Sequence, residues 1–316
     1  MYKCCSLLLL LLLIGSCSKD DPAPVTQADT EIRSYIDSLG ISAVRDESGI
    51  YYYAIDSNPG GVPVSPGTVV SFYYRLSDLN GGTLASVQRS DGDSLLAKQG
   101  ASAIYPVGLD IGLSFMRSGE TFGIILPPSL GYEQLTSGAI DPDLVTLLEV
   151  EVVGVVSEAE VFNQELTEMS DYVSDQNLND LVANPVDPVE FTTSGVAYKR
   201  KREGSGLSPI NGDSIVLNYD ASFISGGSFD SRSDFTFVWG ADIPRPFIPG
   251  LEFGVSRMLT GENALIIIPS SQGYRESAQV IPASIIGDLI DDSIIPDYVS
   301  TIPPYRTLIF DVTRVD

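Results

Sequence analysis

The sequence predicts an α+β protein of two similar domains in tandem, and three observations support this prediction. The chain has 316 residues, a length that accommodates two domains of ordinary size, each with its own core. Residues 105–132 repeat a motif found at residues 245–274, with Tyr132 matching Tyr274. Helical and strand patterns both occur, but there is no strand–helix–strand unit, P-loop or dinucleotide-binding fingerprint.

The composition excludes several classes of function. The chain has 18 Lys and Arg against 42 Asp and Glu, and its net charge of −24 argues against binding to nucleic acid or anionic lipid. We interpret this acidity as a source of solubility, with an acidic binding surface as the alternative. The absence of histidine excludes Ser-His and Cys-His catalytic pairs. The cysteines, Cys4, Cys5 and Cys17, all lie near the N-terminus, so we expect no disulfide or cysteine-ligated metal in the folded body.

Residues 1–16 are predicted to be a lipoprotein signal peptide. Lys3 precedes an apolar run from Leu7 to Ile14 that is too short for a stable membrane-spanning helix. Residues 14–17 resemble a bacterial lipobox, in which the cysteine, here Cys17, is diacylated and becomes the new N-terminus. The alternative is an ordinary secretory signal with an incidental cysteine.

Residues 17–29 are predicted to be a polar tether. Its residues 18–21 read Ser-Lys-Asp-Asp, which resembles the signal that directs Bacteroidetes lipoproteins to the outer leaflet of the outer membrane. We therefore expect an outer-membrane lipoprotein that is exposed at the cell surface, with a periplasm-facing anchor as the alternative.

Residues 30–157 are predicted to form the first domain. Apolar residues at helical spacing predict a helix over 30–39, which Gly40 ends. The acidic stretch 90–94 matches only part of a calcium-binding loop, so we interpret it as a polar turn. The expected strands cover residues 48–53, 67–74 and 144–156.

Residues 158–193 are predicted to contain a connecting helix, because apolar residues recur at helical spacing over 158–181 before a proline-containing break. Residues 194–316 then form the second domain. A helix is expected over 251–259, with Gly261 at its C-terminal cap. The expected strands cover residues 194–198, 213–219, 235–237, 264–268 and 308–312.

The order of short motifs in the second domain resembles the FKBP-type peptidyl-prolyl isomerases. A strand ends at Tyr219, a Phe-Asp pair follows a glycine turn at 229–230, and a Pro-Gly-Leu helix start lies at 249–251. A Gly-Glu turn, a strand ending in Ile-Pro, a Gly-Tyr pair and a final Leu-Ile-Phe-Asp-Val strand complete the set. The resemblance covers 194–316 well and 48–157 more weakly. It implies, for each domain, an antiparallel sheet wrapped around a short helix.

The resemblance implies catalysis of proline isomerisation without a covalent step, cofactor or metal, acting on proline-containing segments of envelope or secreted proteins. Rotation about an Xaa-Pro bond must break amide resonance, a barrier of about 18–20 kcal/mol. A catalyst must bind the twisted amide better than the planar one, which favours a dry pocket with few polar groups. By resemblance, the Ile248 N–H and the Tyr274 hydroxyl bind substrate carbonyls, and Asp230 is a buried carboxylate that orients Tyr219. The candidate catalytic residues are Tyr219, Phe229, Asp230, Ile248, Tyr274 and Phe310, and the candidate substrate-binding residues are Phe235, Phe247, Leu251 and Ile302.

Both domains depart from the family pattern. Leu251 replaces the tryptophan that the best-known members carry at the pocket floor. The first domain keeps Tyr74, Leu109 and Tyr132, but residues 84, 85, 106 and 148 have lost the family types, and Pro106 has no N–H to donate. We therefore predict that the first domain is a non-catalytic copy. The alternative function for the whole chain is a non-catalytic peptide- or protein-binding module.

Residues 276–301 form a longer connection than their first-domain counterpart, residues 133–147. Ile285, Ile286 and Leu289 lie on one face of a predicted short helix. An apolar face of this kind should be covered. We expect it either to thicken the core beside the second-domain sheet or to form a lid over the Tyr274–Phe310 pocket.

Overall fold

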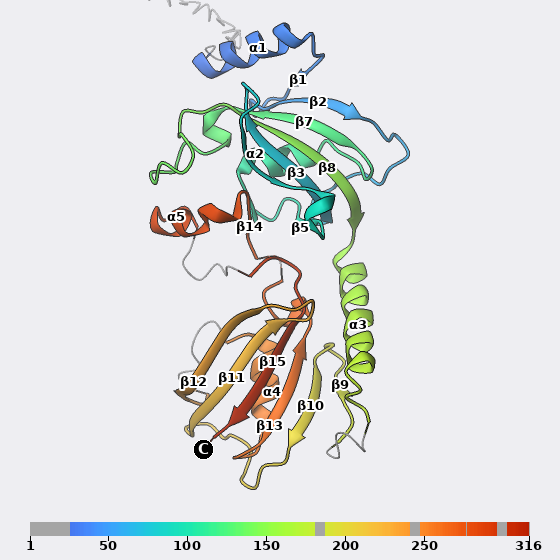
Figure 1. The fold of residues 1–316 in the computed structure, drawn as a ribbon, viewed down its shortest axis with the longest axis vertical. Helices are drawn as coiled ribbons and strands as arrows, with labels where there is room; N and C mark the ends of the chain where they lie inside the picture. The colour runs from blue at the N-terminus through green and yellow to red at the C-terminus, as the bar shows by residue number, and fades with distance from the viewer. Residues whose placement is uncertain (1–25, 181–186, 241–246, 276, 296–301, 316) are drawn as a thin grey trace, which may run out of the picture.

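A computed structural model describes residues 26–180, 187–240, 247–275, 277–295 and 302–315. The expected signal peptide, Cys17 and most of the expected tether lie outside these residues. Figure 1 shows two sheet domains arranged along the long axis of the molecule, with helix α3 (Glu158–Asp175) leading from the first to the second. Among the described residues, no helix combines the length and apolar content needed to cross a membrane.

The first domain is an antiparallel sheet with the strand order β1-β2-β7-β8-β3-β4, in which β5 also pairs with β3. The short helix α2 (Val107–Leu113) packs against this sheet through Leu109 and Leu113, which are fully buried. Two 3-10 turns, η1 (Arg89–Asp91) and η2 (Pro128–Leu130), lie in its connections. The strands are β1 (Val44–Arg45), β2 (Tyr51–Asp56), β3 (Val69–Asp78), β4 (Thr83–Val87), β5 (Leu95–Lys98), β7 (Thr121–Leu126) and β8 (Thr146–Val156).

The second domain repeats this plan with the strand order β12-β11-β15-β13-β10-β9. The expected α+β fold, an antiparallel sheet around a short helix in each domain, is confirmed. Helix α4 (Pro249–Arg257) ends earlier than expected, because Met258 is already extended, and Gly261 lies in the following turn with φ 79°. The 3-10 turn η3 (Ser270–Gln272) precedes Tyr274. The strands are β9 (Glu190–Phe191), β10 (Ala197–Arg202), β11 (Ser214–Phe223), β12 (Ser228–Val238), β13 (Asn263–Ile268) and β15 (Leu308–Arg314).

Glycine lets the α4 helix approach its sheet closely. A Cβ on Gly254 would lie 2.2 Å from the Ile266 side chain, and one on Gly250 would lie 2.4 Å from Ile268. The matching first-domain glycine, Gly112, faces Ile124 in the same way, at 2.5 Å. The repeat in the sequence therefore preserves the close packing of helix on sheet in both domains.

A helix covers the other face of each sheet. In α1 (Gln27–Leu39), Ile32 packs with Tyr51 and Ile125, whereas the neighbouring Ile124 faces α2. In α3, Met169 and Val173 pack on the second sheet in the same manner. Each domain is therefore a sheet between a short central helix and an N-terminal covering helix. The α3 helix ends at Asp175, before the expected end at residue 181.

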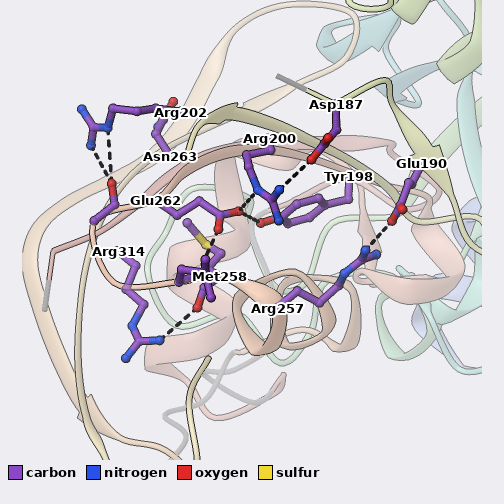
Figure 2. Close-up of polar contacts among 12 residues, drawn as sticks. Asp187, Glu190, Tyr198, Arg200, Arg202, Arg257, Met258, Glu262, Asn263 and Arg314 are labelled. Carbon is purple, nitrogen blue, oxygen red and sulfur yellow. Dashed lines mark hydrogen bonds and ion pairs between the residues drawn. The ribbon is translucent and has the colours of Figure 1, made fainter. Parts of the chain in front are cut away.

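A buried carboxylate stabilises the turn between helix and strand in each domain. The Glu262 carboxylate accepts a hydrogen bond from the Leu259 N–H at 3.0 Å and another from the Tyr198 hydroxyl, and it forms an ion pair with Arg200 at 3.2 Å. Figure 2 shows the Tyr198 and Arg200 side chains converging on Glu262. In the first domain Glu120 accepts from the Arg117 N–H at 2.8 Å. The Gly-Glu motif therefore has the same structural role in both domains, since its carboxylate accepts a hydrogen bond from the turn backbone.

The described part of the 276–301 connection packs on the first domain. It contains β14 (Gln279–Val280), a 3-10 turn η4 (Ala283–Ile285) and helix α5 (Ile286–Asp291). Strand β14 pairs in parallel with β6 (Ile104–Tyr105) of the first domain. The buried residues Ile285 and Leu289 belong to the first-domain core. Both expectations for this connection, core beside its own sheet or lid over its own pocket, are therefore wrong, because its apolar face is covered by the other domain.

Candidate functional site

The residues predicted for the second-domain site come together between the second sheet and helix α4. Tyr219 lies on β11, Phe310 on β15, and Phe229 on the neighbouring strand β12. Leu251 extends from α4, and Tyr274 follows η3. All of the predicted apolar and aromatic residues belong to one core cluster, namely Tyr219, Phe229, Phe235, Phe247, Ile248, Leu251, Tyr274, Ile302 and Phe310.

Tyr219 and Asp230 form the polar pair of this site. The Tyr219 hydroxyl donates a hydrogen bond to Asp230 Oδ2 at 2.6 Å. Burial raises the pKa of the Tyr219 hydroxyl, and its hydrogen bond to Asp230 raises this pKa further. The Asp230 side chain is 41% exposed, with Arg232 Nε at 3.8 Å. The expectation of a buried carboxylate is therefore wrong, although the expected contact with Tyr219 is present.

Aromatic rings form the wall beside this pair. Phe310 is 4% exposed, and its ring centroid lies 5.7 Å from that of Tyr219 and 5.9 Å, edge to face, from that of Phe229. Phe235 packs edge to face on Tyr219 with a centroid separation of 6.2 Å. These geometries are the ones that aromatic pairs prefer. The Tyr219–Asp230 pair is therefore bordered by an apolar, aromatic surface.

The floor and the rim come from α4 and from the loop after η3. Leu251 is 4% exposed and Ile248, the N-cap residue of α4, is 5% exposed. Tyr274 is half-buried, and burial raises the pKa of its hydroxyl, with a further contribution from the charge of Asp230. Within the residues that the structure describes, no partner for the Tyr274 hydroxyl is found. The site thus presents one tyrosine donor above an apolar floor.

The corresponding place in the first domain has a different chemistry. Tyr74, Leu109 and Leu148 are buried there, but Ala85 provides no carboxylate and Leu84 is 41% exposed. Tyr132 is fully buried, and its hydroxyl donates a hydrogen bond to the carbonyl oxygen of Ile281 at 2.8 Å. This tyrosine donor is therefore already used by the chain itself.

The position of Ile281 in the first domain could not be predicted directly from the sequence. The one available signal was a short apolar run, Ala278 to Ile281 around Gln279, immediately before Pro282 in a connection that was too long for its position. That pattern indicates a segment that requires an apolar environment. It does not identify which surface provides it.

A family model described as FKBP-type peptidyl-prolyl cis-trans isomerase matches residues 60–153 and 206–314, more than half of the chain. A probable FKBP-type peptidyl-prolyl cis-trans isomerase FkpA of Neisseria meningitidis is 32% identical over 132 residues, covering 41% of this chain and 40% of that protein. The peptidyl-prolyl cis-trans isomerase FKBP9 of Mus musculus is 25% identical over 237 residues, covering 73% of this chain and 35% of that protein.

Among solved structures, FkpA from Escherichia coli matches with a TM-score of 0.33 and 21% identity, over 50% of this chain and 63% of that chain. The chain spans about two fifths or less of the length of the two curated relatives named above. The family model nevertheless matches both sheet domains. The chain belongs to the FKBP-type peptidyl-prolyl cis-trans isomerase family.

Proposed function

We propose that the second domain catalyses cis-trans isomerisation of Xaa-Pro bonds in protein segments. The observation that carries this proposal is the Tyr219–Asp230 pair, with 2.6 Å between its oxygen atoms, next to the aromatic wall around Phe310. The first domain has no such pair, because Ala85 stands at the place of Asp230.

The arrangement favours a twisted amide without any proton transfer. In the twisted state the carbonyl oxygen carries less charge than in the planar amide. An apolar wall therefore destabilises the planar form more than the twisted form. The Tyr274 hydroxyl and the Ile248 N–H are the groups that would hold substrate carbonyls in place, while Asp230 fixes the orientation of Tyr219. Catalysis then needs neither a nucleophile nor a general base.

A proline-limited refolding assay with the full chain tests this function. Asp230→Ala should lower kcat/KM about tenfold, equivalent to about 1.4 kcal/mol of transition-state stabilisation. Asp220→Ala removes an exposed carboxylate from the adjacent strand and should leave kcat/KM unchanged. Equal activity in wild type, Asp230→Ala and Asp220→Ala would reject the assignment, as would an inactive wild-type chain.

A second candidate function is a binding module that holds proline-containing segments without turnover. Two observations favour it: Leu251 at the pocket floor, and the 41% exposure of the Asp230 side chain. A proline peptide that binds the wild-type chain, while prolyl isomerisation stays at the uncatalysed rate, would support this second function.

We also propose that Cys17 carries a lipid anchor in the outer membrane, so that the clients are envelope or secreted proteins. The lipobox-like residues 14–17 and the acidic tether support this proposal. Cys17→Ala should release the protein from the membrane fraction, and a variant that still sediments with membranes would contradict it. Protease treatment of intact cells distinguishes a surface-exposed anchor from a periplasm-facing one.

A further inference from the structure

The segment Gln279–Pro282 of the second domain lies in the first domain as a bound peptide would. Three hydrogen bonds hold it from two sides. The Gln279 N–H donates to the Ala103 carbonyl at 2.7 Å, and the Ile281 N–H donates to the Tyr105 carbonyl at 2.9 Å. The Tyr132 hydroxyl donates to the Ile281 carbonyl at 2.8 Å. The polar groups of the Ile281 backbone are therefore both satisfied by the first domain.

The side chains of the segment complete the apolar interior of the first domain. Val280 is 2% exposed and Ile281 is 0% exposed. Both belong to the same buried cluster as Tyr74, Leu109 and Leu148. Fully burying an aliphatic side chain contributes about 1.5–3 kcal/mol, so these two residues supply a substantial driving force for docking.

The place that the segment occupies corresponds to the candidate site of the second domain. Tyr132 stands at the same offset from Tyr274 as Tyr105 does from Phe247. Pro106 has no N–H to offer the segment; the Ile281 carbonyl accepts from Tyr132 instead, and the Ile281 N–H donates to the Tyr105 carbonyl of β6. The substitutions that remove catalytic features from the first domain therefore leave a pocket suited to a peptide.

The segment is held at both ends, so it behaves as a tethered ligand. At its base the Ser277 hydroxyl donates to the Ile302 carbonyl at 2.7 Å, which brings both ends of the connection together on the second domain. At its far end the Asp292 carboxylate accepts hydrogen bonds from the Thr136 N–H at 2.8 Å and the Thr136 hydroxyl at 2.5 Å. Figure 1 shows α5 and β14 beside the first sheet domain, away from β13 and β15, the strands that precede and follow them in the second sheet.

We propose that the first-domain pocket is a peptide-binding site for an extended apolar segment with a carbonyl immediately before proline, and that its ligand in this protein is its own segment Gln279–Pro282. The tether keeps the ligand at an effective concentration of about millimolar, so free peptides compete poorly. The first domain thereby binds without turnover and connects the two domains through a ligand contact.

Displacing the segment in the full chain tests this proposal. Ile281→Asp puts a carboxylate at a fully buried position within the apolar core of the first domain, which should expel the segment. A fluorescent peptide of residues 277–287 should then bind this variant saturably in an anisotropy titration. The wild-type chain should bind the same peptide at least about tenfold more weakly. A peptide carrying the Ile281→Asp change is the matched control and should not bind.

Tyr132 identifies the site at which the peptide binds. Adding Tyr132→Phe to the Ile281→Asp chain leaves a buried carbonyl of the peptide without a donor, and should weaken binding about fivefold to a hundredfold. Adding Tyr274→Phe instead reports on the second domain. If Tyr274→Phe weakens binding and Tyr132→Phe does not, the peptide occupies the second domain and the proposal is wrong. A folded Ile281→Asp chain that binds no peptide also overturns it.

If Ile281→Asp does not fold, amide hydrogen exchange in the full chain carrying only Tyr132→Phe tests whether the segment is docked in the first domain. In Tyr132→Phe, amide exchange in residues 279–292 should become several-fold faster, because the docked segment opens more often, while exchange in β8 stays unchanged. Unchanged exchange in residues 279–292 would show that the tyrosine does not hold the segment, and would overturn the proposal.

Discussion

The two pockets share one scaffold but differ in what their central tyrosines contact. Tyr132 is fully buried and donates to Ile281 of the other domain at 2.8 Å. Tyr274 is half-buried, and among the described residues its hydroxyl has no partner. The comparison teaches that apolar walls, a tyrosine donor and the backbone carbonyls of Ala103 and Tyr105 together hold the segment in the first domain. In this chain the carboxylate and the aromatic wall distinguish the proposed catalytic pocket from the binding pocket.

The largest expected effect comes from disturbing the occupied pocket. Ile281→Asp should lower the unfolding free energy by about 3 kcal/mol or more, because a fully buried aliphatic side chain is replaced by a carboxylate without a partner. Chemical denaturation monitored in the first domain measures this. Ile210→Asp is the matched control, since Ile210 is 69% exposed, and should change the unfolding free energy by less than about 0.5 kcal/mol. Similar losses for both variants would contradict the docked position of Ile281.

The second expected effect comes from replacing an aromatic residue of the proposed catalytic pocket, in the second domain, by the leucine found at the matching position of the first domain. Phe310→Leu copies Leu148 and removes the edge-to-face contact with Phe229 and the contact with Tyr219. Aromatic pairs of this kind are worth about 0.5–1.5 kcal/mol each. We expect kcat/KM for prolyl isomerisation to fall roughly threefold to thirtyfold while the domain stays folded. Unchanged kcat/KM would show that the aromatic wall does not distinguish the two sites.

The two covering helices, α1 and α3, provide a further comparison. Each is held by a buried carboxylate, and the pKa values of these two carboxylates are shifted in opposite directions. On α1, Asp29 accepts from the Tyr51 hydroxyl at 2.5 Å and from Arg45 at 3.0 Å. The hydrogen bond from Tyr51, with those from Arg33 and Arg45, lowers the pKa of Asp29, against the opposing effect of burial. On α3, burial raises the pKa of Glu165, against the lowering effect of its hydrogen bonds from Ser270.

A lowered pKa in the folded state predicts acid sensitivity of the first domain. The ionised Asp29 stabilises the fold above its unfolded pKa, near 3.8, and this contribution is lost as the pH falls through its folded pKa. At neutral pH, Asp29→Asn should cost about 1–2 kcal/mol, because hydrogen bonds to a charged group are weakened. Asp37→Asn, on the exposed face of the same helix, is the control. Equal stability of the two variants at pH 7 would refute this role.

A raised pKa predicts the reverse for the second domain. In the unfolded chain the Glu165 carboxyl ionises near pH 4.5, whereas in the folded protein it ionises at a higher pH because its pKa is raised. The folded state therefore loses stability as the pH rises from 4.5 through the folded-state pKa. Glu165→Gln keeps an acceptor for the Ser270 N–H and removes this loss. Relative to wild type, Glu165→Gln should therefore become progressively more stable as the pH rises above 4.5. Denaturation curves at a series of pH values measure this, and parallel curves for both proteins would contradict it.

The sequence predicted the fold because its cues were local or repeated. The glycines that bring α4 onto its sheet and the matched Tyr132 and Tyr274 could be recognised without coordinates. The exposure of Asp230 could not, since it depends on how the side chains of neighbouring strands pack around it. The position of Ile285 was also inaccessible, because an amphipathic pattern shows that a face is covered and carries no information on which domain covers it.

The central claim is that one pocket is open to proline peptides and the other is occupied by the chain itself. The most direct test is a titration of the intact, isotope-labelled protein with a short apolar Xaa-Pro peptide, followed by NMR chemical shifts. The resonances of Tyr219, Asp230 and Tyr274 should shift saturably, while those of Ile104 and Tyr132 stay in place. Shifts at Ile104 and Tyr132 in the wild-type protein, with none around Tyr274, would contradict this account.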